Sequence, residues 1–402
     1  MKKKMLFITN LLPYPLNNGG KIKTFNALKI LSKLCDIDVI CFVNDKNELQ
    51  YKTALEELSL NIVCVIKKIE MHKNPVLLIV ELIKSLFSFY PYVVSKFYSR
   101  LFRKEIKKLI AQKTYDIVYV DHLPLYQYVE RIKALGKSKV ILDQHNVENE
   151  IIKRRLDVSG NIFAKLFLPY EYKKLLAFEK RACATCDITL AITERDKTCL
   201  SALTKGKGNF RVAPFYINSE HKEYYNVNHK DKVILFLGTM SWYPNVDGLL
   251  WFYENVFKKF KLALEGYSLL IVGNKPTDAL CGLHDGKNII VTGFVPDTLP
   301  YLSQAILSIV PIRFGSGMRI KILELMSFGM PVVSTTIGCE GIGCENLKEI
   351  IIADEAEAFY NSLTMLSADV DLRKKLSDNS RAFIKNKYSY EKACQDYEGE
   401  LN

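Results

Sequence analysis

The feature that most constrains the fold is an alternation, made twice along the chain, between short apolar β-branched runs and helical stretches. The first half predicts strands at residues 5–9, 38–42, 62–66, 117–120, 140–142 and 188–191, with helices such as 22–34 and 125–135 between them. The second half predicts strands at residues 233–237, 268–272, 289–292, 307–311, 331–334 and 350–352. Apolar strands joined by helical crossovers form parallel sheets that are covered on both faces. We therefore expect an α/β chain with two Rossmann-like domains facing one another across a cleft.

The two series of strands are separated by a polar stretch, which sets the expected domain boundaries. Residues 1–215 form the first domain, residues 216–231 the linker, and the second domain begins at residue 232. A chain of 402 residues is long enough for each domain to bury its own apolar core. In open sheets of this kind, ligands bind outside the carboxyl ends of the strands.

The apolar runs and the cysteines indicate a cytoplasmic protein. The longest candidate for a membrane span, residues 76–94, is interrupted by Glu81, Lys84 and Pro91, so we expect no transmembrane helix. The apolar run at residues 5–8 is too short for a signal peptide. The ten cysteines show no disulfide framework, and most lie in apolar strands, as reduced thiols do.

The positive charge of the chain is concentrated in one segment. The net charge is +12, and residues 66–113 hold eleven Lys or Arg against three Asp or Glu. On a helix, five cations share one face, opposite an apolar face of Tyr98, Phe102, Ile106 and Leu109; they are Lys96, Arg100, Arg103, Lys104 and Lys107. One interpretation is an ordinary surface helix. The other is that these cations, with the apolar stretch 76–89, rest on an anionic membrane. Nucleic-acid binding is disfavoured, because no aromatic base-stacking motif accompanies the cations.

The richest motif is a glycine loop between a predicted strand and a helix. Gly315, Ser316 and Gly317 precede a helix that ends at Gly329. Glycines before a helix let backbone N–H groups approach an anion, and the helix dipole favours negative charge there. Arg319 and Lys321 add two cations, and Glu324 lies on the same helical face as Lys321. A carboxylate accepts hydrogen bonds from hydroxyls, so the pattern suits a diphosphate attached to a ribose. A capped helix with a solvated Lys–Glu pair is the alternative for such a loop alone.

The segment reads Gly-Ser-Gly-x-Arg-x-Lys-x-Leu-Glu and resembles the donor motif of the retaining GT-B glycosyltransferases of family 4. The resemblance implies that Glu324 binds the ribose hydroxyls and that Gly317, Arg319 and Lys321 bind the diphosphate. The family usually carries a second glutamate eight positions earlier, where this chain has Ser316. The resemblance therefore leaves the donor sugar unidentified.

The resemblance covers nearly the whole chain. Residues 12–20 resemble the family's first glycine-rich loop, so that Gly19 and Gly20 approach the donor phosphate or the acceptor. Residues 292–297 resemble the segment whose backbone, near Val295, meets the base. The second domain is expected to end at residue 385, and residues 386–402 resemble the closing helix that packs on the first domain.

A histidine at a strand end completes the expected site. Asp143-Gln-His145-Asn-Val-Glu148 follows a predicted strand, and His145 matches the family histidine that faces the donor sugar. Asp143 and Glu148 are both candidates to orient its ring. A polar loop residue is the plain alternative for a lone histidine.

The resemblance implies retaining transfer of one sugar from a UDP- or GDP-type nucleotide sugar to a glycan acceptor, with no cofactor and no metal. His145, Arg319 and Lys321 are the expected catalytic residues. A lipid-linked acceptor for surface polysaccharide would explain docking on the inner face of a membrane. Two alternatives stay open: a nucleotide-sugar epimerase of the same architecture, and a non-catalytic partner subunit, which the missing glutamate at Ser316 supports.

Overall fold

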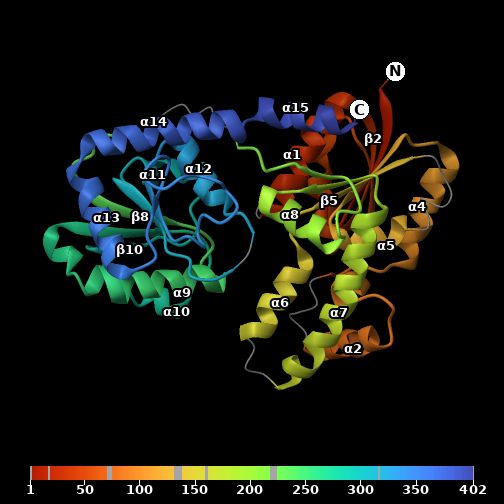
Figure 1. Ribbon diagram of the computed structural model, residues 1–402, viewed down its shortest axis with the longest axis horizontal. Coiled ribbons are helices and arrows are strands. Elements are labelled where there is room, and N and C mark those ends of the chain that lie inside the picture. Colours follow the sequence, from red (N-terminus) through yellow and green to blue (C-terminus); the bar gives the residue numbers. More distant parts are fainter. Residues whose placement is uncertain are drawn as a thin grey trace. The chain divides into compact units, whose positions relative to one another are not determined.

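The computed structural model of the chain describes residues 2–16, 19–69, 75–130, 138–158, 162–217, 224–315 and 317–401. The chain divides into two compact units. Unit 1 contains Met1–Phe215 and Ala393–Asn402, and unit 2 contains Tyr216–Lys392. Each unit is a parallel sheet with helices on both faces (Figure 1). The expectation of two Rossmann-like domains is thus confirmed.

Unit 1 is built on a seven-stranded sheet in the order β3-β2-β1-β4-β5-β6-β7, and every pairing between neighbouring strands is parallel. Its strands are β1 (Lys3–Thr9), β2 (Cys35–Val43), β3 (Asn61–Ile66), β4 (Ile117–Asp121), β5 (Lys139–Gln144), β6 (Ile188–Ala191) and β7 (Phe210–Val212). Its helices include α1 (Gly19–Leu34), α2 (Pro75–Leu86), α3 (Tyr92–Ser95), α4 (Arg100–Gln112), α5 (Tyr126–Val129), α6 (Glu148–Val158), α7 (Ile162–Thr185) and α8 (Glu194–Leu203). The central strands are buried along almost their whole length, which explains their uninterrupted apolar sequences.

Unit 2 repeats this plan with a six-stranded parallel sheet in the order β10-β9-β8-β11-β12-β13. Its strands are β8 (Lys232–Leu237), β9 (Tyr267–Val272), β10 (Ile289–Val291), β11 (Leu307–Val310), β12 (Val332–Ser334) and β13 (Ile351–Ile352). Its helices include α9 (Tyr243–Phe252), α10 (Asp278–Cys281), α11 (Leu299–Leu302), α12 (Ile320–Phe328), α13 (Ala356–Ala368) and α14 (Val370–Lys387). Ile234, Leu269 and Phe359 belong to its apolar core.

Both sheets reverse their direction of winding at one point, and this point predicts where each unit binds ligands. In unit 1 the reversal lies between β1 and β4, and in unit 2 between β8 and β11. Crossover helices leave a crevice at the carboxyl ends of the strands on either side of such a reversal. Thr9 ends β1 and Asp121 ends β4, whereas Gly238 follows β8 and the glycine loop follows β11.

Several elements differ in detail from the sequence-based expectation. The edge strand β7 was not expected, because it is short and only partly buried. The expected helix at residues 125–135 is a 3-10 turn at Leu123–Leu125 followed by α5; residues 131–137 lie outside the described part. Helix α1 begins at Gly19, so Gly19 and Gly20 open a helix and do not form a loop.

Two segments were expected to connect the units. Unit 2 begins at Tyr216, and in the described part of the stretch 216–231 the Tyr225 hydroxyl donates to the Ile306 carbonyl at 2.6 Å and its N–H donates to the Phe328 carbonyl. The closing helix is α15 (Tyr390–Leu401), and its residues from Ala393 onward belong to unit 1. Of the helices in the described residues, none has the length and apolar character needed to cross a bilayer.

Candidate active site

In unit 2, two cationic side chains and an amide lie close together beyond the ends of β8 and β11. We call Asn245, Arg319 and Lys321 the lysine cluster. Asn245 lies in the first turn of α9, Arg319 immediately precedes α12, and Lys321 lies in the first turn of α12. The cluster therefore lies where two helices begin, beside the reversal point of the sheet. The sequence predicted Arg319 and Lys321 but not Asn245. A signal for Asn245 was present, because Pro244-Asn245 begins a helix shortly after the buried strand β8 and Gly238.

The Lys321 amine is held inside the protein. Its Nζ donates to Asn245 Oδ1 at 2.9 Å and lies 4.3 Å from the centre of the Phe236 ring. A side chain at Gly238 would bring its Cβ to 3.3 Å from this Nζ and 3.0 Å from the Asn245 amide nitrogen, so glycine leaves room for this contact. Burial, together with the nearby Arg319 cation, lowers the pKa of Lys321 to about 7. A bound anion would stabilise the charged amine.

Arg319 folds back over the glycine loop. Its guanidinium lies 5.4 Å from the centre of the Trp242 ring, and Nη1 donates to the Gly317 carbonyl. Gly315 and Gly317 have φ angles of 129° and 84°, which favour glycine. Within the described part of the chain, no side chain forms a capping hydrogen bond to the first turn of α12. Ser316, the position of the absent glutamate, lies outside the described residues.

The other donor residues expected in unit 2 occupy separate positions. Glu324 projects from α12 and is exposed, yet desolvation by surrounding protein raises its pKa to about 7. Val295 is half-buried in the loop that follows β10. Neither residue is a member of the lysine cluster, so their roles toward a donor remain predictions.

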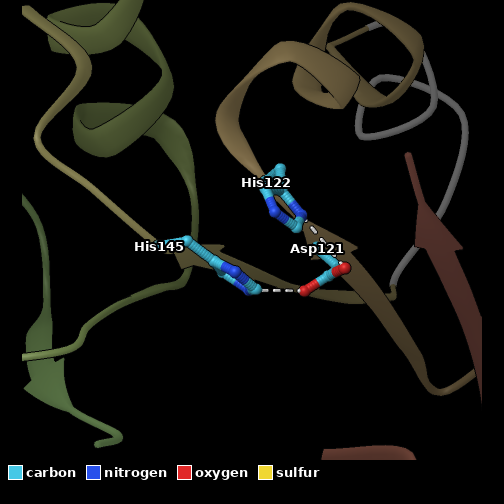
Figure 2. A group of neighbouring side chains, drawn as sticks. All are labelled: Asp121, His122 and His145. Carbon is cyan, nitrogen blue, oxygen red and sulfur yellow. Dashed lines mark hydrogen bonds and ion pairs between the residues drawn. The ribbon is translucent and has the colours of Figure 1, made fainter. Parts of the chain in front are cut away.

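Unit 1 forms a second polar group at its own reversal point. Asp121, His122 and His145, which we call the histidine cluster, are drawn in Figure 2. His145 Nε2 lies 2.8 Å from Asp121 Oδ1, and His122 Nδ1 lies 3.1 Å from Asp121 Oδ2. The two imidazole rings are 3.7 Å apart between centres. Asp121 is fully buried, and His145 is only 7 % exposed.

The partner of His145 corrects the expectation from the sequence, where Asp143 and Glu148 were the candidates. Asp121 and Asp143 are register neighbours at the ends of β4 and β5, but Asp143 Oδ2 is 3.9 Å from His145 Nε2. Asp143 is instead engaged by the buried Lys23 amine and the Tyr119 hydroxyl. Asp121 was missed, although it is an acidic residue at a strand end, the same signal that pointed to His145.

The protonation of the histidine cluster follows from its charges. Burial alone would raise the pKa of Asp121, but His122 and His145 hold it well below its usual range. Burial, His122 and Lys23 lower the pKa of His145 to about 4. Burial opposes protonation of His122, but the Asp121 carboxylate outweighs it and raises the pKa of His122. At neutral pH, His145 is therefore the neutral ring, while the Asp121 carboxylate favours a proton on His122.

The histidine cluster also offers atoms of the types that bind metal ions. Within the described residues, its three ligand-type atoms form the one group of His, Cys, Asp or Glu atoms lying within 4.8 Å of one another. These atoms already bond to each other, and Asp121 Oδ2 also accepts from the hydroxyls of Thr9 and Thr24 at 2.7 and 2.8 Å. A divalent ion would have to displace these bonds. We therefore describe the cluster as a hydrogen-bonded one.

The cationic face expected to meet a membrane is only partly formed. Lys96 lies outside α4, at the end of α3, and burial lowers its pKa. The apolar face of α4, with Phe102, Ile106 and Leu109, is part of the core of unit 1 and cannot enter a bilayer. Arg100, Lys104 and Lys107 are exposed and Arg103 is half-buried.

Comparisons with known proteins find a family and a relative that this chain resembles. Residues 231–369, all within unit 2, match the model of the family "Glycosyl transferases group 1". A curated relative from Klebsiella pneumoniae, "Uncharacterized 44.6 kDa protein in cps region", is 24% identical over 401 residues, with 97% of each chain covered.

Solved structures share the fold of this chain. Sucrose-phosphate synthase from Thermosynechococcus elongatus has a TM-score of 0.71 at 14% identity, covering 100% of this chain and 98% of its own. Anabaena HepE in complex with UDP-glucose has a TM-score of 0.63 at 13% identity, with 99% of both chains covered. A TarM mutant of S. aureus, in complex with UDP and α-GlcNAc-glycerol, has a TM-score of 0.64 at 12% identity, with 100% of both chains covered.

Proposed function

We propose that this chain, a glycosyltransferase, transfers one sugar from a nucleotide-sugar donor of UDP or GDP type to a glycan acceptor. The observation that carries the proposal is the half-buried Lys321 amine, which lies beside Arg319 in the first turn of α12. A cation, a helix N-terminus and a glycine loop at one point form a site for a diphosphate. The UDP and UDP-glucose complexes of structurally similar proteins support this choice of donor.

We assign the remaining donor contacts from the resemblance to the retaining enzymes of family 4. Glu324 binds the ribose hydroxyls, backbone near Val295 meets the base, and Gly19 and Gly20 lie close to the donor phosphate or the acceptor. His145 faces the donor sugar. Transfer retains the configuration at the anomeric carbon. Arg319, Lys321 and the N–H groups of α12 stabilise the leaving diphosphate, so that the reaction requires no metal.

Thermal stabilisation by a panel of UDP- and GDP-sugars tests the proposal and identifies the donor. A ligand that binds the folded state at 100 times its Kd stabilises it by about 2.7 kcal/mol. The cognate nucleotide sugar should raise Tm and be hydrolysed slowly in the absence of an acceptor. Stabilisation without any hydrolysis or transfer would indicate a non-catalytic partner subunit. Epimerised donor as the product would indicate the epimerase alternative.

Glu324→Gln should weaken donor binding by about 10-fold to 100-fold at pH 8. A carboxylate that accepts hydroxyl hydrogen bonds contributes about 1.5–3 kcal/mol. Because the pKa of Glu324 is raised to about 7, the group is ionised at pH 8 and largely protonated at pH 6. The wild-type advantage over the variant should therefore shrink as the pH falls. Calorimetry measures both affinities, and Glu357→Gln, on α13, is a matched control. Equal affinities at pH 8, with an unchanged Tm, would remove Glu324 from the ribose site.

We propose further that the acceptor is carried on a lipid at an anionic membrane surface, for surface polysaccharide. The relative in the cps region supports a polysaccharide role. Unit 1 also exposes large apolar side chains where α2 ends: Phe87 is 89 % and Phe89 74 % exposed. A groove of about 460 Å³ lined by Lys67, Lys84, Ser88, Tyr90, Ser95 and Tyr98 connects this end of α2 with the segment before α4. Cations beside exposed aromatic rings suit an anionic bilayer.

Co-sedimentation with vesicles tests this membrane contact. Binding should require anionic lipid and fall steeply from low to high salt. Charge reversal at Arg100, Arg103 and Lys107 should abolish it, whereas Phe87→Ser with Phe89→Ser should weaken it by about 10-fold at every salt concentration. Charge reversal at Lys258 and Lys259, in unit 2, is the control. If the protein binds neutral and anionic vesicles equally, or binds neither, the membrane contact is excluded and the acceptor is a soluble one.

A further inference from the structure

The Asp121 carboxylate is within hydrogen-bond distance of both histidines of the histidine cluster. Its Oδ2 accepts the hydroxyls of Thr9 and Thr24 and lies within hydrogen-bond distance of His122 Nδ1, while its Oδ1 faces His145 Nε2 at 2.8 Å. An ionised carboxylate has lone pairs and no proton to give. Because Asp121 is buried and ionised, each group that touches it must act as a donor.

This requirement decides where the proton of His145 lies. A neutral imidazole carries one N–H, and the nitrogen facing Asp121 must be the one that holds it. The ring of His145 is therefore protonated at Nε2, and its Nδ1 has a free lone pair. Within the described residues, Nδ1 is buried and has no hydrogen-bond partner. A buried acceptor left without a donor is costly, and such a group is expected to meet a ligand.

We propose that Asp121 is a positioning residue that holds His145 in the Nε2–H tautomer, so that Nδ1 accepts a hydrogen bond from a ligand hydroxyl. The chemical class of that ligand group follows from the tautomer. A hydroxyl can donate to Nδ1, whereas a phosphate oxygen without a proton cannot. His145 thus contacts a sugar or acceptor hydroxyl and does not protonate the leaving diphosphate. The assignment of this hydroxyl to a sugar rests on the proposed function. The assignment of the tautomer does not depend on it.

The surrounding charges keep this arrangement stable across neutral pH. Among the described residues, the charged or titratable groups that act on His145 besides Asp121 are Lys23 on α1, Asp143 on β5 and His122 after β4; Glu148 on α6 acts on His122. The Lys23 amine is paired with Asp143, and His122 contacts Asp121. Burial first, and then repulsion from His122 and Lys23, disfavours a proton on His145 and lowers its pKa.

Asp121→Asn changes the tautomer while keeping the size of the side chain. The new amide can donate to Nε2, which allows the proton to move to Nδ1 and turns the ligand-facing acceptor into a donor. We expect nitrogen NMR of the free protein at pH 7 to show Nε2 protonated in His145 of the wild type and Nδ1 protonated in the variant. Transfer should fall by about 100-fold, while the KM for the nucleotide sugar changes by less than about threefold.

Thr24→Val is the matched control, because it removes one donor from the same carboxylate but leaves the Oδ1–Nε2 contact intact. It should keep the Nε2–H tautomer and most of the transfer rate. Wild-type His145 protonated at Nδ1, or on both nitrogens at pH 7, would overturn the proposal even if Asp121→Asn fails to fold. The proposal also fails if Asp121→Asn folds and keeps the wild-type tautomer and rate. If the tautomer is as inferred but His145→Ala transfers normally, the role in transfer fails and the tautomer stands.

Discussion

Lys321→Met is expected to lower turnover by about 100-fold to 1000-fold while raising the KM for the nucleotide sugar by less than about 10-fold. The diphosphate gains negative charge as the glycosidic bond breaks, so a cation at this point stabilises the transition state more than the bound substrate. Methionine keeps much of the apolar volume of the side chain over Phe236 but removes the charge that Asn245 holds in place.

The pH dependence of kcat/KM identifies the same amine. The pKa of Lys321 in the free protein is lowered to about 7, so the amine is mostly charged at pH 6 and loses its charge as the pH rises through 7. The rate should therefore fall on the alkaline side in the wild type, and this limb should be absent from Lys321→Met. Arg319→Ala should also reduce turnover. It should move the limb to higher pH, because loss of a neighbouring cation raises the pKa of Lys321.

Steady-state kinetics between pH 6 and about pH 9 measures both effects. Lys258→Met provides the control, since this exposed amine of unit 2 pairs with Glu254 and lies outside the lysine cluster. A nucleotide sugar is the substrate of choice, because its diphosphate has no terminal phosphate group that titrates near pH 6. Variants that raise only KM, or an alkaline limb that survives in Lys321→Met, would show that Lys321 does not act on the leaving group.

The strand pattern of this chain was sufficient to predict both sheets. The buried middle residues of these parallel strands are apolar, so β1, β4 and β8 are visible in the sequence. Strand β7 was missed because its three residues are half-buried or exposed, and a short run of this kind does not differ from a loop. Helix α4 was identified by its two faces, but its periodicity alone could not show that the apolar face is covered by the core.

Site residues were predictable only where they lie close together in the sequence. The glycine loop, Arg319 and Lys321 are neighbours along the chain and form a recognisable motif. The groups that hold them are distant: Asn245 lies 76 residues before Lys321, and Asp121 lies 24 residues before His145. Such pairs meet because parallel strands place their carboxyl ends at one edge of the sheet. A single sequence shows that these ends come together, but not which of Asp121, Asp143 and Glu148 contacts the ring.

His145→Ala is expected to lower transfer by about 100-fold to 10,000-fold and to leave nucleoside diphosphate binding nearly unchanged. His145 belongs to unit 1, whereas the diphosphate site that we propose is built by residues of unit 2. The side chain offers one buried acceptor, Nδ1, which is matched to a hydroxyl. Removal of a group that acts in the transition state lowers kcat and kcat/KM together.

Replacing His145 by amides of different length tests whether Nδ1 accepts a hydrogen bond or the ring only fills space. In His145→Asn, an amide oxygen can take the place of Nδ1, so this variant should retain about 10-fold more activity than His145→Ala. His145→Gln carries its amide near the position of Nε2, facing Asp121, and should resemble alanine. Turnover and calorimetric binding of the nucleoside diphosphate, measured for all three variants, check the order. Loss of diphosphate binding in His145→Ala would move His145 out of the sugar subsite. The Asn variant places an acceptor at the position of Nδ1, and the Gln variant does not. Equal activity of the two variants would therefore show that no hydrogen bond is accepted at Nδ1.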